Sequence, residues 1–411
     1  MTAPMFDTDH VRSLFPAFSA PELADLVHFE NAGGSYACGF VIDRLTRFYR
    51  TRKMQPYGAA APTRLGGEEM DEARTRLAAL LGIARDELSF GPSTTQNTYV
   101  LAQAFRQFLS PGEAIVVTNQ DHEANTGPWR RLSQDGIEIR EWKMDPATGH
   151  LDPEKLADLL DEDVRLVCFP HASNVVGEVN PVVEITAMAH AAGAFVCVDG
   201  VSYAPHGLPD IGSLGPDIYL FSAYKTYGPH QGIMAIRREL GMLLPNQGHV
   251  FNGDTLYKRF TPAGPDHAQV AACAGIADYI DALAAHHGVA GDAQPAARGA
   301  FVHDLMRQRE FEAMLPLLDA LKDRNDVRLL GPADAESRAP TLALDLGRPA
   351  EPVAAALAEK GIIAGGGDFY AGRALSAMGV KRENGVLRLS FTHYTSDAEI
   401  AKLIGALDTV L

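Results

Sequence analysis

AFVCVDGVSYAPHGLPDIGSLGPDIYLFSAYK, residues 194–225, is the stretch of this chain that decides its fold. It holds two short apolar runs, Ala194–Asp199 and Ile218–Phe221, which are bounded by turn-forming residues. Runs of this kind are typical of strands that are buried on both faces of a mostly parallel sheet. Asp199 and Lys225 follow the two apolar runs and lie 26 residues apart, which leaves room for one strand–helix excursion between them.

The same alternation continues toward the N-terminus. Two more apolar runs, Ala114–Val117 and Arg165–Phe169, predict strands, and the stretches Thr95–Leu109 and Glu184–Ala192 predict helices. Gly193 follows the second of these helices and can end it. Strand, helix and strand in alternation predict an α/β domain with right-handed crossovers.

The pattern changes after about residue 290. Ala300–Leu321 predicts a helix with a kink or break at Pro316, and Thr341–Leu346, Gly385–Phe391 and Asp397–Leu411 predict strand, strand and helix. This order indicates a smaller α+β domain at the C-terminal end. The predicted division is an N-terminal segment packed on the small domain at 1–25, a large domain at 26–285 and a small domain at 286–411.

Composition limits the classes of partner. Lys+Arg is 36 and Asp+Glu is 52, so the formal charge is 36 − 52 = −16, which argues against nucleic acid and against an anionic membrane. The start of the chain shows no signal peptide, and no uncharged apolar run approaches the roughly 18 residues of a membrane span. The chain has four cysteines, Cys38, Cys168, Cys197 and Cys273, and none belongs to a CxxC pair or a metal-ligand cluster. We therefore expect a cytoplasmic protein without disulfides or a metal site.

Polar side chains follow several of the predicted strands. Asp199 and Lys225 do so in the deciding stretch, His122 follows the run at 114–117, and Asn174 follows the run at 165–169. Ligands bind at the carboxyl ends of the strands in open α/β sheets. An acid, an amine, an imidazole and an amide should therefore converge on one edge of the sheet.

A further element lies at Gly91-Pro-Ser-Thr-Thr95, directly before a predicted helix. Its backbone N–H groups, its hydroxyls and the helix dipole could hold a phosphate, although a simple helix cap has the same composition. A buried acid, a lysine, an aromatic ring and a phosphate cradle are together what pyridoxal 5'-phosphate (PLP) requires. The lysine forms a Schiff base with the aldehyde, and the acid keeps the pyridine nitrogen protonated so that the ring accepts electrons from a carbanion at the substrate Cα.

With these residues in place, the chain resembles the class V aminotransferase family of fold type I PLP enzymes, the group that contains cysteine desulfurases and selenocysteine lyases. The resemblance runs from about residue 28 to the C-terminus. Its motifs occur in family order: Glu30-Asn-Ala-Gly-Gly34, Ser93-Thr-Thr-Gln96, Asp121-His-Glu-Ala-Asn125, Ser173-Asn-Val-Val-Gly177, Val198-Asp-Gly200, Phe221-Ser-Ala-Tyr-Lys-Thr-Tyr-Gly-Pro229, and Arg388 before Thr392-His-Tyr-Thr-Ser396.

The resemblance implies a large domain with a mostly parallel seven-stranded sheet, a small C-terminal α+β domain, and a homodimer in which the partner subunit completes each active site. It also implies catalytic roles for Lys225 as the Schiff-base and proton-transfer lysine, Asp199 at the pyridinium nitrogen and His122 stacked on the ring. The resemblance further implies that the phosphate is bound by Thr94, Thr95 and Ser222, and that Asn174 and Ser202 lie near the phenolic oxygen. Tyr224 would also contact the cofactor. Arg388 would clamp the carboxylate of the substrate, and Asn31 would be a second substrate contact.

Departures from the family pattern limit the reaction. Desulfurases carry a nucleophilic cysteine on a loop of the small domain, but Gly361–Gly372 has none and no cysteine follows Cys273. Ser202 stands where desulfurases usually have glutamine, and Tyr224 replaces a histidine. A threonine of the partner usually touches the phosphate, whereas this chain offers only Gly264-Pro-Asp there. A persulfide-forming reaction therefore lacks its nucleophile.

The sequence thus predicts a PLP enzyme that acts on a small amino acid through a Cα carbanion, with β-elimination of the carbon–sulfur lyase type favoured. An aminotransferase is the first alternative and an amino-acid racemase or epimerase the second. A nicotinamide dehydrogenase and a nucleotide hydrolase are disfavoured because the strings GxGxxG and GxxxxGK[ST] are absent. A non-catalytic protein on the same fold is a further alternative.

Overall fold

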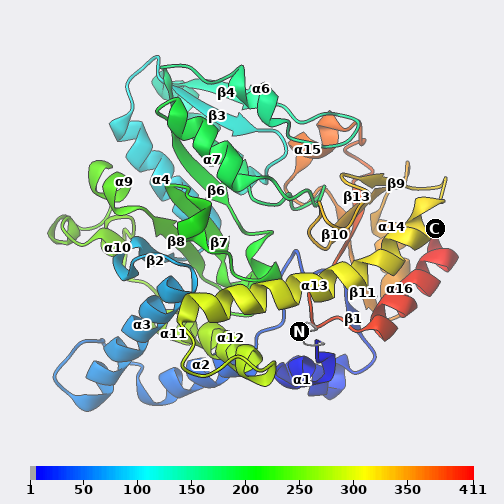
Figure 1. Ribbon diagram of the computed structural model, residues 1–411, viewed down its shortest axis with the longest axis horizontal. Coiled ribbons are helices and arrows are strands. Elements are labelled where there is room, and N and C mark those ends of the chain that lie inside the picture. The colour runs from blue at the N-terminus through cyan, green and yellow to red at the C-terminus, as the bar shows by residue number, and fades with distance from the viewer. Residues whose placement is uncertain (1–5) are drawn as a thin grey trace.

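The computed structural model describes residues 6–411 and has a seven-stranded sheet at its centre (Figure 1). The strand order is β2-β8-β7-β6-β5-β3-β4. Only β8 runs antiparallel to its neighbours; the other strand pairs of this sheet are parallel, as predicted. The strands are β2 (Leu88–Gly91), β3 (Ala114–Thr118), β4 (Glu138–Trp142), β5 (Val164–Pro170), β6 (Phe195–Asp199), β7 (Ile218–Ser222) and β8 (Gly232–Ile236).

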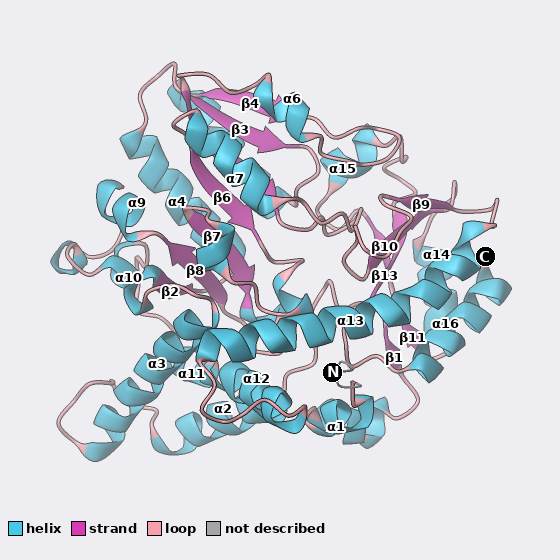
Figure 2. Cartoon of the chain, in the orientation of Figure 1, coloured by secondary structure: helices cyan, strands magenta, loops and turns pink. Residues whose placement is uncertain are grey.

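The central strands are apolar along their length because helices cover both faces of the sheet (Figure 2). Successive side chains of a strand point to opposite faces. Val196 and Val198 of β6 accordingly belong to one buried cluster, and Cys197 between them belongs to another. The helices of this part are α2 (Gly39–Thr51), α3 (Ala61–Leu80), α4 (Thr94–Phe108), α5 (Glu123–Arg130), α6 (Pro153–Ala157), α7 (Val182–Ala191), α8 (Ile211–Leu214), α9 (Arg238–Leu243), α10 (Leu256–Arg259), α11 (His267–Ala272) and α12 (Ala274–His286).

One helical run of the described residues, His267–His286, is long and apolar enough to cross a membrane by length and composition alone. The run comprises α11 and α12, packs against α2 and α3, and is mostly buried. It therefore contributes to the core in this fold.

The C-terminal part is built on a four-stranded antiparallel sheet of order β12-β13-β10-β9. The strand and helix predictions at residues 341–346, 385–391 and 397–411 are confirmed to within a residue or so. Its elements are β9 (Arg328–Leu330), β10 (Thr341–Asp345), α14 (Glu351–Ala358), β11 (Ile362–Ile363), β12 (Gly365–Gly367), α15 (Gly372–Ala377), β13 (Val386–Ser390) and α16 (Asp397–Val410).

The long helix α13 (Pro295–Lys322) connects the two parts and crosses the front of the molecule in Figure 1. Of the two predictions at Pro316, a kink or a break, the break is wrong, because the helix continues through this residue to Lys322, and the kink stays a prediction. Pro316 is exposed, and apolar residues on either side of it, Met314 and Leu317, are buried. The packing of this buried stripe holds the helix together despite the missing N–H group.

The N-terminal segment contacts both parts of the chain. From helix α1 (Thr8–Ser13), Arg12 pairs with Glu399 of α16 at 2.8 Å. Asp7, in turn, accepts a hydrogen bond from His286 of α12. Strand β1 (Val27–His28) pairs with β11, so the first residues of the predicted large domain join the C-terminal part. Residues 1–5 of the predicted N-terminal segment lie outside the described residues, and the division into 1–25, 26–285 and 286–411 stays a prediction.

Candidate active site

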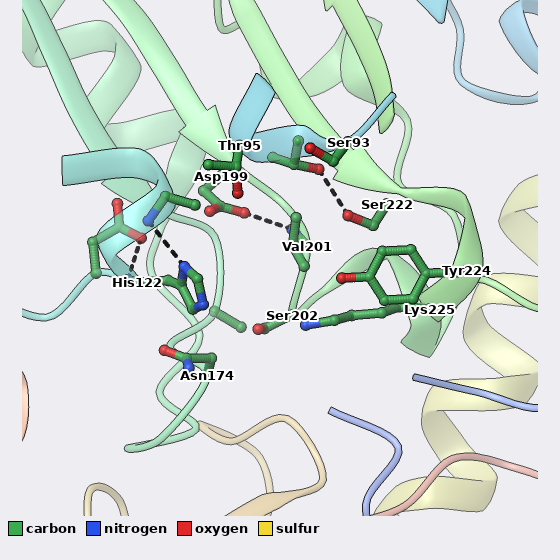
Figure 3. Close-up of a pocket in the computed structure, with 14 residues that line it drawn as sticks. Ser93, Thr95, His122, Asn174, Asp199, Val201, Ser202, Ser222, Tyr224 and Lys225 are labelled. Atoms are coloured by element: carbon green, nitrogen blue, oxygen red, sulfur yellow. Dashed lines mark hydrogen bonds between the residues drawn. The ribbon is translucent and has the colours of Figure 1, made fainter. Parts of the chain in front are cut away.

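A pocket of about 490 Å³, counted to its open mouth, lies at the carboxyl ends of β3, β5, β6 and β7. Every residue that the sequence predicts as a cofactor contact lines it, and Figure 3 shows these side chains converging from separate strand ends. The lining residues are Ser93, Thr94, Thr95, Asp121, His122, Ala124, Ala172, Asn174, Asp199, Val201, Ser202, Ser222, Tyr224 and Lys225.

Lys225 follows β7 on a single 3-10 turn, Ala223–Lys225. Its side chain is buried, and among the ion pairs of residues 6–411 none involves it. Burial, with a smaller contribution from Arg388, lowers the pKa of the Lys225 amine to about 8, although the carboxylates of Asp199 and Glu30 act in the opposite direction. Part of the amine is therefore neutral near neutral pH, which a nucleophile and base requires.

Asp199 is the last residue of β6, and its Oδ1 accepts a hydrogen bond from the backbone N–H of Val201 at 2.8 Å. Burial raises the pKa of this carboxyl to about 6, despite that hydrogen bond and the nearby Lys225. A buried carboxylate that is held in place but lacks a strong cationic partner can hold a cation. The arrangement suits a protonated ring nitrogen.

His122 caps the N-terminus of α5, with its Nδ1 accepting from the backbone N–H of Ala124 at 3.0 Å. Burial and the positive charges of Lys225 and Arg388 lower the pKa of this imidazole to about 4. His122 is thus neutral near neutral pH, and a neutral imidazole can stack on an aromatic ring without charge repulsion.

Hydroxyl groups gather at the N-terminus of α4, on the side of the pocket where Figure 3 shows Ser93, Thr95 and Ser222. Ser93 caps the helix by accepting from the N–H of Gln96, and the hydroxyls of Thr94 and Ser222 lie 2.8 Å apart. The free backbone N–H groups of the first turn and these hydroxyls form a site for an anion.

Asn174 projects from the loop that follows β5. Its Nδ2 donates to the backbone oxygen of Phe369 at 2.9 Å, and its Oδ1 is buried without a partner. The amide therefore links the pocket to the segment that precedes α15.

The two predicted substrate residues do not line the pocket. Arg388 lies on β13, buried, with its Nη2 donating to Glu30 Oε1 at 2.5 Å and its Nη1 donating to the Asn174 backbone oxygen at 3.2 Å. Burial lowers the pKa of Arg388, and Glu30 partly offsets this effect.

Asn31, the other predicted substrate residue, is hydrogen-bonded within the protein. Its Nδ2 donates to the backbone oxygens of His28 and Ser390, and its Oδ1 accepts from the hydroxyl of Tyr394. With both ends of the amide bonded inside the protein, Asn31 joins the N-terminal segment to β13, and its role as a substrate contact stays a prediction.

Asp121 and Glu30, at or beside the pocket, had no predicted role, and the sequence did not place Phe369 against Arg388. Asp121 lines the pocket, and burial together with the charge of Asp199 raises the pKa of its carboxyl well above the usual range. Glu30 and Phe369 contact Arg388. Asp121 follows β3, so the strand-end argument could have found it. The other two contacts join segments far apart in the sequence, and no local pattern marks them.

Comparison with known proteins agrees with this geometry. The family model for aminotransferase class V matches residues 27–260. An aminotransferase-like protein of Gibberella zeae is 30% identical over 100% of both chains, and a cysteine desulfurase of Serratia proteamaculans is 30% identical over 98% of both. The chain belongs to the class V aminotransferase family. Members of this family are PLP-dependent enzymes.

Solved structures support the same fold. A cysteine desulfurase of Thermococcus onnurineus superposes with a TM-score of 0.86 at 22% identity, over 99% of each chain. A cysteine desulfurase of Escherichia coli gives 0.81 at 24% identity, over 99% of this chain and 98% of the other. At this level of identity the likeness shows the fold alone, which is the fold type I arrangement predicted from the sequence.

The residues of the pocket fit PLP. The cofactor has a cationic ring nitrogen, a phenolic oxygen, an aldehyde and a phosphate. The pocket of this class V aminotransferase family member offers a buried carboxylate, an amide NH2 group with a second hydrogen to donate, a buried amine and a helix N-terminus with hydroxyls. Each of these groups matches one part of the cofactor in charge and hydrogen-bonding capacity.

Proposed function

We propose that this class V aminotransferase family member removes the α proton of a small amino acid at Lys225 and completes a β-elimination of the carbon–sulfur lyase type. The observation that carries the proposal is the buried Lys225 amine, which makes no ion pair among the described residues and shares one pocket with the buried carboxylate of Asp199. When bound, PLP supplies an electron sink for the electron pair left at the substrate Cα.

Each side chain of the pocket has a separate role in the proposed reaction. Lys225 Nζ would hold the cofactor aldehyde, yield to the substrate amine, and then receive the Cα proton. Asp199 would hold the ring nitrogen in its protonated form, and the neutral imidazole of His122 would cover one face of the ring. Thr94, Ser222 and the first turn of α4 would hold the phosphate.

The remaining cofactor contacts fall to side chains near the phenolic oxygen and the lysine. Asn174 and Ser202 would lie near that oxygen, Thr95 at the phosphate and Tyr224 beside the lysine. Arg388 would receive the substrate carboxylate. A guanidinium can hold a carboxylate by two parallel hydrogen bonds, which would orient the Cα–H bond toward Lys225.

Elimination is favoured by the segment from Gly361 to Gly372, which carries no cysteine. The four cysteines, Cys38, Cys168, Cys197 and Cys273, are all buried, so none of them is placed as an exposed nucleophile. Elimination needs only the base Lys225 and a leaving group on the substrate Cβ. Transamination and racemisation use the same first proton transfer and stay as alternatives.

A panel of small amino acids tests the proposal. The purified protein with added PLP is incubated with cysteine, cystine, cysteine sulfoxides, serine and alanine, and free ammonia and keto acid are measured together. Equal amounts of ammonia and pyruvate are expected from the substrates with a leaving group. Keto acid without ammonia would instead indicate an aminotransferase, and inversion at Cα without keto acid would indicate a racemase. A protein that gains no visible absorbance with PLP would refute the enzyme proposal.

We also propose that the protein is a homodimer in which the partner subunit completes the pocket. The apolar side chains of Val250 and Phe251 are 94% and 83% exposed, and such side chains are commonly covered by another subunit. Light scattering after size-exclusion chromatography should give twice the monomer mass of 44.2 kDa. Replacing Phe251 by Asp should shift the protein toward the monomer, and a wild-type monomer at micromolar concentration would refute the dimer.

A further inference from the structure

The guanidinium of Arg388 is held on its edge and on its face. On its edge, Nη2 donates to Glu30 Oε1 at 2.5 Å and Nη1 donates to the Asn174 backbone oxygen at 3.2 Å. On its face, the ring of Phe369 lies 3.8 Å from the guanidinium carbon. These contacts reach Arg388 from three separate segments of the chain, so they fix the position and the plane of its charge.

Phe369 is itself fixed in this place by the backbone. Phe369 and Tyr370 have φ angles of +52° and +57°, the left-handed region that residues with a side chain seldom adopt. The Phe369 oxygen accepts from Asn174 Nδ2, and the Tyr370 oxygen accepts from the N–H of Glu123, both at 2.9 Å. Strained backbone of this kind persists where the surrounding structure requires it.

The Phe369 ring packs closely against Gly365, where a larger residue would not fit without displacing it. A Cβ atom added to Gly365 would lie 2.7 Å from the ring of Phe369 and 2.9 Å from Glu30 Oε2. Three polar atoms of this cluster are buried without partners: Arg388 Nε, Glu30 Oε2 and Asn174 Oδ1. Of these atoms only Arg388 Nε is a donor, and an unsatisfied buried donor is costly in a folded protein and indicates a site for an acceptor such as a carboxylate oxygen.

We propose that Phe369 is a positioning residue that holds the guanidinium of Arg388 for the carboxylate of the substrate. This inference rests on the proposed function, because it takes Arg388 as the group that receives that carboxylate. Phe369 lies in the segment that carries the nucleophile in desulfurases, and in this chain the segment would serve recognition.

The physical basis is the restraint of a flexible side chain. A free arginine samples many rotamers, and ordering it on binding costs free energy that weakens the complex. The Phe369 ring on one face of the guanidinium and the Glu30 carboxylate on its edge order the Arg388 side chain before the substrate binds, so this free energy is not lost on binding. Because Glu30 balances the charge of Arg388, the buried cation is also tolerated while no substrate is bound.

The test is calorimetric titration of the purified protein, saturated with PLP, with propionate, which has a carboxylate and no amine. Phe369→Ala should weaken propionate binding about tenfold, the middle of the range for a stacked cation. Phe369→Tyr should restore wild-type affinity because it retains the ring. Gly365→Ala, which leaves Phe369 intact and displaces its ring, should weaken binding in the same direction. Tyr370→Ala is the matched control, because Tyr370 shares the strained segment and is 73% exposed; its affinity should match the wild type.

Several results would overturn the inference. Unchanged propionate affinity in Phe369→Ala, or an equal loss in Tyr370→Ala, would show that the ring does not position Arg388. Absence of propionate binding to the wild-type protein would show that Arg388 is not available to a carboxylate. Binding that persists in Arg388→Ala would place the carboxylate elsewhere.

The proposed function fails by a different measurement. Ethylamine, which has an amine and no carboxylate, should change the absorbance of bound PLP equally in the wild type and in Phe369→Ala. No absorbance change with any amine, together with a normal propionate response, would refute the proposed function and leave the positioning role of Phe369 standing.

Discussion

Replacing Asp199 by Asn should stabilise the cofactor-free protein, by an amount that grows as the pH rises above 3.8 and is complete above about 6. Burial raises that pKa from 3.8 to about 6, so the folded state binds this proton more tightly than the unfolded chain does. The carboxyl therefore costs nothing below pH 3.8, and the cost grows as the pH rises to about 6. A rise of about two pH units corresponds to about 3 kcal/mol at pH 8.

Asparagine has the same shape and can still accept the hydrogen bond from the N–H of Val201, so the substitution removes the charge and little else. For a chain of 411 residues, about 3 kcal/mol corresponds to a rise in Tm of roughly 3–4 °C. Differential scanning fluorimetry of the wild-type and Asp199→Asn apoproteins between pH 4.5 and pH 8.5 measures this difference in Tm. Asp254→Asn, at an exposed position, is the control for loss of one negative charge.

The sign of the effect should reverse when PLP is added, because only the carboxylate can pair with the cationic ring nitrogen. PLP should therefore raise the Tm of the wild type by more than that of Asp199→Asn, and turnover of the variant should fall by orders of magnitude. A variant apoprotein no more stable than the wild type at pH 8, or a gain that is the same at pH 4.5, would refute the reasoning.

Lys225→Ala should abolish the covalent adduct that borohydride forms between PLP and the protein, and mass spectrometry that finds the adduct on another lysine would contradict the assignment. Thr94→Val removes a hydroxyl bonded to Ser222 at 2.8 Å. It should raise the Kd for PLP about tenfold or more, in line with a hydrogen bond to a charged group; an unchanged Kd in a fluorescence titration would argue against a phosphate contact. Pro316→Ala should stabilise α13 by up to about 3 kcal/mol, because it supplies the missing N–H on an exposed face. A lower Tm in that variant would contradict this account of the helix.

The sequence alone determined the α/β order, the strand ends and the residues that follow them. Asp199, Lys225, His122 and Asn174 could be predicted to converge because apolar runs of four to seven residues are local signals and parallel strands align their carboxyl ends. The sequence left a kink and a break at Pro316 both open, because local propensity disfavours proline inside a helix and only packing decides that α13 continues to Lys322.

The surroundings of Arg388 were decided by the tertiary structure alone. Glu30 and Arg388 are 358 residues apart in the chain, and Phe369 meets the guanidinium through a segment whose backbone is held by Asn174 and Glu123. Periodicity and spacing report which face a residue lies on within its own helix or strand. They carry no information on which distant side chain fills the remaining space, because that is fixed only when segments far apart in the chain fold against one another.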